Sequence, residues 1–173
     1  MHNQQLTEIQ RVFTSRLETL EHLLDVGEKH FKDTDTFMGK RLAEDMFPFG
    51  GQIAFVCNQP RGFSQWCAGE PIDNLAPDSI QTIEQARAAI VQTKRLVAGI
   101  AAADSKLEEI KRIGLGRGRY VELQGHRYVA DYLLPNLYFH VTSAYAILRL
   151  LGAPVGKSDY LYYLAPMVKQ EGA

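Results

Sequence analysis

The sequence predicts an all-α protein: one domain over residues 1–173, built as a four-helix bundle with a short β-hairpin between the third and fourth helices. Four long segments carry apolar residues that recur every three or four positions, the period of a helix with one buried face. Glycine and proline residues mark the ends of these segments. Hydrophobic residues make up 46% of the chain and charged residues 23%, which is ordinary for a domain with a substantial core.

The first and third helices are read directly from their apolar stripes. We expect the first over residues 5–31 and the third over residues 78–103, opening at Asp78 or Ser79. Charged residues occupy the opposite face of the first segment, as in a helix that packs on one side only. The stripes consist of Leu6, Ile9, Phe13, Leu17, Leu20, Leu24 and Gly27 in the first segment, and of Ile80, Ile83, Ile90, Val91 and Val97 in the third.

The second helix is predicted over residues 45–68, with Asp45 as its N-terminal cap. Pro48 falls in the first turn, where a helix accepts proline without losing a hydrogen bond. Pro60 lies deeper in the segment, so we expect it to kink or break the helix. Gly69 ends the segment and opens a linker.

The fourth helix is predicted over residues 131–151 and is apolar nearly all round, with a proline near its start. Gly152 and Pro154 form a conventional stop after it. A helix without a polar face must be covered on both sides. We therefore expect either the residues after Gly152 or a second subunit to cover its outer face.

The predicted hairpin lies between the third and fourth helices. Residues 120–123 and 126–129 are rich in strand-forming side chains, and Gln124-Gly125 between them is suited to a turn. The glycine-rich stretch before the first strand does not favour nucleotide binding. It lacks the Lys-Ser/Thr ending of a phosphate loop and precedes a strand rather than a helix.

Two polar residues of the fourth helix are the main candidates for a functional site. Asn136 and His140 are four residues apart, so they share one helical face, whose far end is apolar. A bundle core that becomes polar at one end is a frequent place for a ligand pocket. His140 could act there as a base or a ligand, since its proton affinity lies near neutrality. It could equally be a buried histidine that hydrogen-bonds to Asn136 or to a backbone carbonyl.

Three further residues are weaker candidates. Asp45 and Gln52 are seven residues apart and share a face of the second helix, so they could line the same cavity. Their alternative roles are a helix cap for Asp45 and an edge of the core for Gln52. Arg87 falls on the apolar stripe of the third helix, where a buried guanidinium needs an acidic partner. Asp45 and Asp131 are the partners that we expect for it.

Composition argues against several classes of protein. The net charge is −1 and no long basic run is present, so we expect no nucleic-acid partner. No apolar run reaches the length of a membrane span, and the first residues are polar, so we expect neither a membrane anchor nor a signal segment. Cys57 and Cys67 are separated by ten residues of one predicted helix, about 15 Å, which is too far for a disulfide. A reducing cytoplasm is the location that we expect.

Two stretches of sequence carry a family resemblance. AEDMFPFGGQIAFVC in the second helix and LLPNLYFHVTSAYAILRLLGAPVGKSDYL in the fourth resemble the domain-of-unknown-function family numbered nineteen ninety-three. The specific motifs lie at residues 45–48, at residues 134–136 with His140, and at residues 156–159. The resemblance extends from the first helix to Leu161. That family belongs to the DinB-like superfamily of four-helix bundles, so a DinB-like bundle that pairs as a homodimer is implied.

The resemblance also raises the question of a metal. Better-studied DinB-like relatives are metal-dependent enzymes, some of them thiol-dependent transferases or isomerases, and they hold a divalent metal with one histidine on the second helix and two on the last. Only His140 matches such a position here. Asn136 stands where the other ligand of the last helix is expected, and the second helix offers Gln52 or Asn58-Gln59. We therefore predict no metal site, with His140 as the only candidate ligand. The family has no established activity.

Three functional hypotheses follow. The first is a bundle that binds, and could act on, a small ligand in a polar pocket at one end. In that pocket Asn136 and His140 would orient the ligand, Gln52 would add a hydrogen bond, and Arg87 would neutralise an anion or brace Asp45. The second is a divalent-metal-dependent enzyme related to the thiol-dependent transferases.

The third hypothesis is a non-enzymatic, dimeric interaction or stress protein. It predicts a dimer seam on the outer face of the fourth helix, formed by Tyr138, Val141 and Tyr145.

Overall fold

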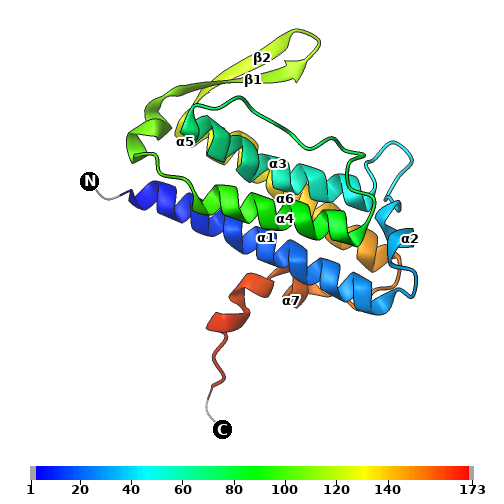
Figure 1. Ribbon diagram of the computed structural model, residues 1–173. Helices are drawn as coiled ribbons and strands as arrows, with labels where there is room; N and C mark the ends of the chain where they lie inside the picture. Colours follow the sequence, from blue (N-terminus) through cyan, green and yellow to red (C-terminus); the bar gives the residue numbers. More distant parts are fainter. Residues whose placement is uncertain (1–2, 172–173) are drawn as a thin grey trace.

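The predicted four-helix bundle is confirmed. The computed structural model describes residues 3–171, and its four long helices lie side by side (Figure 1). Helices α1 and α6 run in one direction, and α3 and α4 run in the other, with α6 antiparallel to α3 and α4 antiparallel to α1 (Figure 1). The long helices are α1 (Gln4–His30), α3 (Phe49–Ala68), α4 (Ile83–Ala98) and α6 (Leu134–Leu150).

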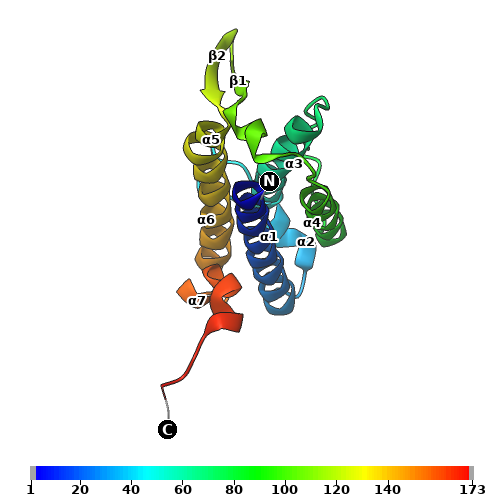
Figure 2. The ribbon, with the colours of Figure 1, turned by 90° about the vertical axis from the view of Figure 1, so that its left-hand side faces the viewer.

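Short elements connect and extend these helices. A two-stranded antiparallel hairpin projects from one end of the bundle, and a helical tail packs against α1 near the other end (Figure 2). The short elements are α2 (Thr34–Met38), η1 (Asp104–Glu108), β1 (Ile110–Gly116), β2 (Arg119–Gln124), α5 (Gly125–Arg127), the π-helix η2 (Tyr128–Leu133), α7 (Lys157–Tyr160) and η3 (Tyr162–Met167).

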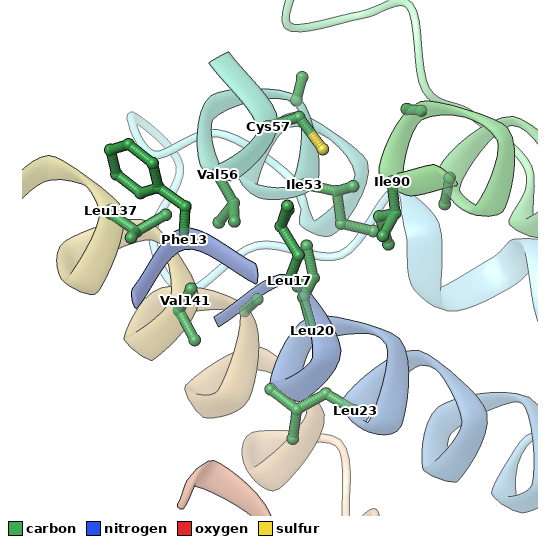
Figure 3. Packing of buried hydrophobic residues seen from close by; sticks show 14 of the residues in the cluster. Phe13, Leu17, Leu20, Leu23, Ile53, Val56, Cys57, Ile90, Leu137 and Val141 are labelled. Carbon is green, nitrogen blue, oxygen red and sulfur yellow. The ribbon is translucent and has the colours of Figure 1, made fainter. Parts of the chain in front are cut away.

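The core lies between the four long helices, and each contributes the apolar stripe that the sequence predicts or its buried neighbours (Figure 3). The helical period places these side chains on the inner faces, where burial of each one stabilises the fold by about 1.5–3 kcal/mol. The central contacts are made by Phe13, Leu17, Leu20, Leu23, Ile53, Val56, Cys57, Ile90, Leu137 and Val141, each with at most 1% of its surface exposed.

Helix α4 is shorter than predicted because a capping box sets its start. The Thr82 hydroxyl accepts a hydrogen bond from the backbone N–H of Gln85 at 3.3 Å, and the Gln85 side chain accepts one from the N–H of Thr82 at 3.1 Å. This reciprocal pair satisfies donors that a helix start leaves unpaired. Ile80 has the spacing of the stripe but lies before the cap, where it is buried as part of the linker.

Of the kink or break predicted at Pro60, the break is absent, because α3 continues through this residue. Proline removes the hydrogen bond to the carbonyl of Val56 and costs a free helix several kcal/mol. Helix α3 is buried along almost its whole length, and this packing offsets the loss. The predicted cap is wrong too: Asp45 lies in an exposed loop, and α3 begins only after Pro48.

The hairpin is present where expected, but its strands are shifted. The turn consists of Gly116, Arg117 and Gly118, whose φ angles of 78°, 53° and 73° are all in the left-handed region. Glycine has no Cβ, so the two glycines adopt these φ angles at little cost in free energy. The predicted second strand, residues 126–129, is helical instead.

Gly125 is therefore a packing residue rather than a turn residue. A Cβ atom at this position would lie 2.6 Å from the indole of Trp66 and 2.7 Å from the Cα of Leu107. Only a residue without a side chain lets the end of β2 approach both of them.

A long crossover, residues 69–82, joins α3 to α4 where the sequence predicts a linker over residues 69–78. It returns along α3, which makes α3 and α4 parallel (Figure 1). Two side chains of α3 form hydrogen bonds with the backbone of this crossover and hold it in place. The Asn58 amide donates to the carbonyl of Leu75 at 2.9 Å and accepts from its N–H at 2.8 Å, and the Gln65 carbonyl oxygen accepts from the N–H of Asp73 at 3.0 Å.

The chain's own residues cover the outer face of α6. Val141 is 1% exposed, and the ring of Tyr145 packs edge-on against Tyr160 of the tail at 6.0 Å. The hydroxyl of Tyr138 accepts a hydrogen bond from Arg16 at 3.4 Å. The seam predicted for a dimer is thus largely filled from within the chain, and the homodimer itself stays a prediction.

We expect Asp159→Ala to loosen the tail. The Asp159 carboxylate lies 2.7 Å from Nε2 of His22 on α1 and also accepts from the N–H of Gly156 at 2.7 Å. Tyr162 stacks on the His22 ring at 4.0 Å. The Asp159 carboxylate therefore links α7 to α1 directly, and it also orients the ring on which η3 packs. Its loss should cost about 1 kcal/mol and speed amide hydrogen exchange over residues 157–167.

Hydrogen exchange followed by mass spectrometry checks this, with Ser158→Ala at an exposed neighbouring position as the matched control. Equal exchange in the two variants would mean that apolar packing alone holds the tail.

Candidate functional site

A cavity of about 330 Å³ lies where α3, the crossover, β1 and the start of α6 meet. This volume is at the lower end of the range for small-molecule sites. The cavity is lined by Phe55, Asn58, Gln59, Gly62, Ile72, Asn74, Lys111, Arg112, Ile113, Gly114, Tyr128, Tyr132, Leu133, Asn136 and His140.

His140 forms one wall of this cavity and is 9% exposed. Its ring stacks on Phe55 with 4.7 Å between the centroids and 12° between the planes. Phe139 meets the same ring edge-on at 5.1 Å. The two aromatic contacts fix the plane of the imidazole.

Gln52 determines which nitrogen of His140 carries the proton. The Nε2 amide of Gln52 donates to the carbonyl of Phe47 at 2.9 Å, so its Oε1 is the atom that lies 2.8 Å from Nδ1 of His140. An amide oxygen only accepts hydrogen bonds, so Nδ1 must be the donor. In the neutral ring the lone pair is then on Nε2, and no residue of the described range 3–171 donates to it.

His140 is neutral at physiological pH. Burial lowers the pKa of its imidazole from the ordinary 6.5 to about 4, because the charged ring is poorly solvated there. The side chain therefore presents a neutral hydrogen-bond acceptor, with the proton held on the Gln52 side. A group with so low a pKa is a weak general base at pH 7.

Two amide side chains place further acceptors at the cavity wall. Asn136 donates from Nδ2 to the carbonyl of Tyr132 at 2.6 Å, and Gln59 donates from Nε2 to the carbonyl of Phe55 at 3.0 Å. Both are internal i to i−4 contacts of their own helices. Each contact uses the NH₂ group and leaves the carbonyl oxygen for other partners.

A π-helical turn, η2, shapes the start of α6. Pro135 lies two residues after its end and has no N–H to bond the carbonyl four residues earlier, which favours a widened turn. The predicted helix start at residue 131 is thus the interior of a helical stretch that begins at Gly125. The widened turn supplies Tyr128, Tyr132 and Leu133 to the cavity.

The structure brings together three of the five predicted candidates. Asn136 and His140 line the cavity. Gln52 is not a lining residue, but its side chain forms a hydrogen bond with His140. Arg87 lies elsewhere, and both of its predicted partners are wrong. It pairs with Asp25 at 2.7 Å and with Glu28 at 2.5 Å, both on α1.

The error comes from the burial expected for Arg87, whose side chain is 39% exposed. It lies at the α1–α4 seam, where acidic residues of α1 are closest. Asp131 pairs with Arg127 one turn earlier at 2.8 Å, and Asp45 is exposed in the loop before α3.

The cavity does not fit the three-histidine metal site of the DinB-like enzymes. His140 offers one nitrogen, and its other nitrogen is engaged by the amide of Gln52. The remaining polar side chains of the wall are amides, cations and the hydroxyls of Tyr128 and Tyr132, which are not the usual ligands for zinc, nickel or manganese. Within the described residues no three His, Cys, Asp or Glu side chains gather in a way that could hold a metal ion.

The cysteines are also unsuited to chemistry at this site. Burial raises the pKa of the Cys57 thiol to about 12 and that of Cys67 to about 11. Both stay protonated near pH 7, and neither lines the cavity.

Sequence reasoning missed the aromatic and basic parts of the wall. Phe55 could have been found, because it lies three residues after Gln52 and helical spacing puts the two side by side. Ile72 and Lys111 carry no such signal. They reach the cavity through the crossover and the hairpin, whose paths no local pattern reveals.

The fold is that of a DinB-like protein, a four-helix bundle with a two-stranded hairpin before its last long helix. The chain belongs to the family called "Domain of unknown function (DUF1993)", whose profile matches residues 7–161. This is the family that the motifs of the second and fourth helices indicate.

A solved structure supports the assignment. A DinB family member protein from Shewanella denitrificans is similar to this chain, with 26% identity and a TM-score of 0.78, over 93% of this chain and 96% of that one. No curated protein matches the sequence. Across residues 3–171, no helix is long and apolar enough to cross a membrane.

Proposed function

We propose that this protein binds a small organic molecule in the cavity beside His140. The observation that carries the proposal is the fixed tautomer of that residue. A chain of two hydrogen bonds, from Phe47 through Gln52, orients the imidazole and leaves Nε2 as a bare acceptor. His140 lines the cavity, and its Nε2 is not among the buried atoms that lack a partner, so it can be reached from the cavity. This arrangement is suited to a ligand that supplies an O–H or N–H group.

The remaining wall supports an aromatic or branched apolar ligand body. Phe55, Ile72, Tyr128, Tyr132 and Leu133 contribute rings and aliphatic groups. Sites for small molecules typically combine such a surface with a few placed polar groups. Asn136 and Gln59 are positioned to add polar contacts through their amide oxygens.

Binding of phenol tests the proposal, with toluene as a matched fragment that lacks the donor. We expect phenol to bind the wild type and to shift the Nε2 resonance of His140 in ¹⁵N-detected imidazole spectra. The double variant Gln52→Leu/His140→Phe replaces both hydrogen-bonding partners with apolar groups and keeps a ring on Phe55. It should bind phenol about fivefold more weakly, because one hydrogen bond is worth about 1 kcal/mol.

His126→Phe, at an exposed histidine of α5, is the control and should bind phenol as the wild type does. The proposal fails if phenol and toluene bind the wild type equally, or if the double variant keeps full affinity for phenol. Circular dichroism of the variants establishes that the fold is intact.

A further inference from the structure

One side chain of the cavity has a charge without a counter-charge. Lys111 is half-buried on β1 and lines the cavity together with Ile113, which lies two residues further on the same face of the strand. No carboxylate of the described residues lies within ion-pairing distance of its ammonium group. The neighbouring Lys106 differs, since it pairs with Glu109 at 2.7 Å.

The electrostatic surroundings of Lys111 contain no compensating acid. Burial lowers the pKa of its ammonium, and the charge of Lys106 lowers it further. No aspartate or glutamate is among the residues that line the cavity. A half-buried cation in such a wall is stabilised by an anion that enters with the ligand.

The second cation of the wall is already engaged. The Arg112 guanidinium stacks over the ring of Tyr120 at 3.8 Å, and the residue is exposed on the alternate face of the strand. Of the two cations among the lining residues, Lys111 is therefore the one that has no ion pair or aromatic partner within residues 3–171. One ammonium group matches one negative charge, which favours a carboxylate over a phosphate, because phosphate sites usually gather several donors.

Because Lys111 and the acceptor of His140 line the same cavity, we infer that the ligand is a small organic carboxylate. Its carboxylate binds Lys111, its aromatic or branched body packs on Phe55 and Tyr132, and an O–H or N–H group at its other end donates to Nε2 of His140. The inference rests on the proposed function and adds to it the charge of the ligand.

Three probes with one body and different charges test the inference. 4-Hydroxyphenylacetate carries the carboxylate and a phenolic donor, 4-hydroxyphenylacetamide is its neutral match, and tyramine is its cationic match. Titration calorimetry at low salt should give an affinity for the carboxylate at least tenfold above that for the amide, with tyramine weakest. Lys111→Met keeps the length of the side chain and removes its charge, so it should abolish this preference.

Lys40→Met, at an exposed lysine outside the cavity, is the matched control and should keep the preference. Equal affinity for carboxylate and amide, or an unchanged preference in Lys111→Met, would overturn the inference while phenol binding still supported the proposed function. Tighter binding of phenyl phosphate than of the carboxylate would overturn the carboxylate assignment. Failure of the three probes and of phenol alike would overturn both proposals.

Discussion

Gly50→Ala is expected to destabilise the bundle by about 3 kcal/mol, although alanine is the better helix former. A Cβ atom at position 50 would lie 2.0 Å from the carbonyl oxygen of Ile80. That oxygen belongs to the backbone, so no rotamer change can relieve the clash. Either α3 or the end of the crossover must move, and both are buried at this point. For a chain of this size the loss should lower the melting temperature by roughly 6–12 °C.

Urea unfolding at pH 7 measures the change, and Gly39→Ala is the matched control. Nothing lies within 4 Å of a Cβ atom at Gly39, and its φ of −85° suits any residue. The control should stay within about 0.5 kcal/mol of the wild type. If Gly50→Ala did the same, the close approach of the crossover to α3 would be wrong, and so would the wall that Ile72 forms in the cavity.

The helices were predictable because their signals are local. The stripe of α1 predicts residues 5–31, and the helix spans Gln4–His30. Asn136 and His140 share a face by spacing alone, which is why the sequence indicates their side of the cavity. Of the motifs that indicate the family, the one at residues 134–136 with His140 lies on α6 and contains these two residues.

The features that the sequence did not predict depend on tertiary structure. Gln52 and His140 are 88 residues apart, so only the packing of α3 on α6 brings them into contact. The hairpin was misplaced because β1 contains two glycines and two adjacent basic residues, and this hides its strand pattern. Lys111 reaches the cavity wall because it lies on β1. Its position could not be predicted from a sequence in which β1 itself was not recognised.

Acidification should weaken the fold through His140, and this is the second large effect that we expect. Its pKa is about 4 in the folded protein and near 6.5 in the unfolded chain, so between these values the unfolded state binds more protons. Stability contributed by the neutral ring is therefore complete above pH 6.5 and is lost as the pH falls toward 4. At pH 5 the loss should reach about 2 kcal/mol.

The Gln52→Leu/His140→Phe variant isolates this contribution, because its remaining groups titrate as in the wild type. Unfolding free energies at pH 7 and pH 5 should differ by about 2 kcal/mol more in the wild type than in the variant. His126→Phe should behave as the wild type, since this exposed ring is well solvated in both states. An identical pH dependence in all three proteins would mean that solvent reaches the His140 ring and stabilises its charged form. The neutral acceptor that the ligand proposal needs would then be absent below neutrality, and binding of phenol would have to decline over the same pH range.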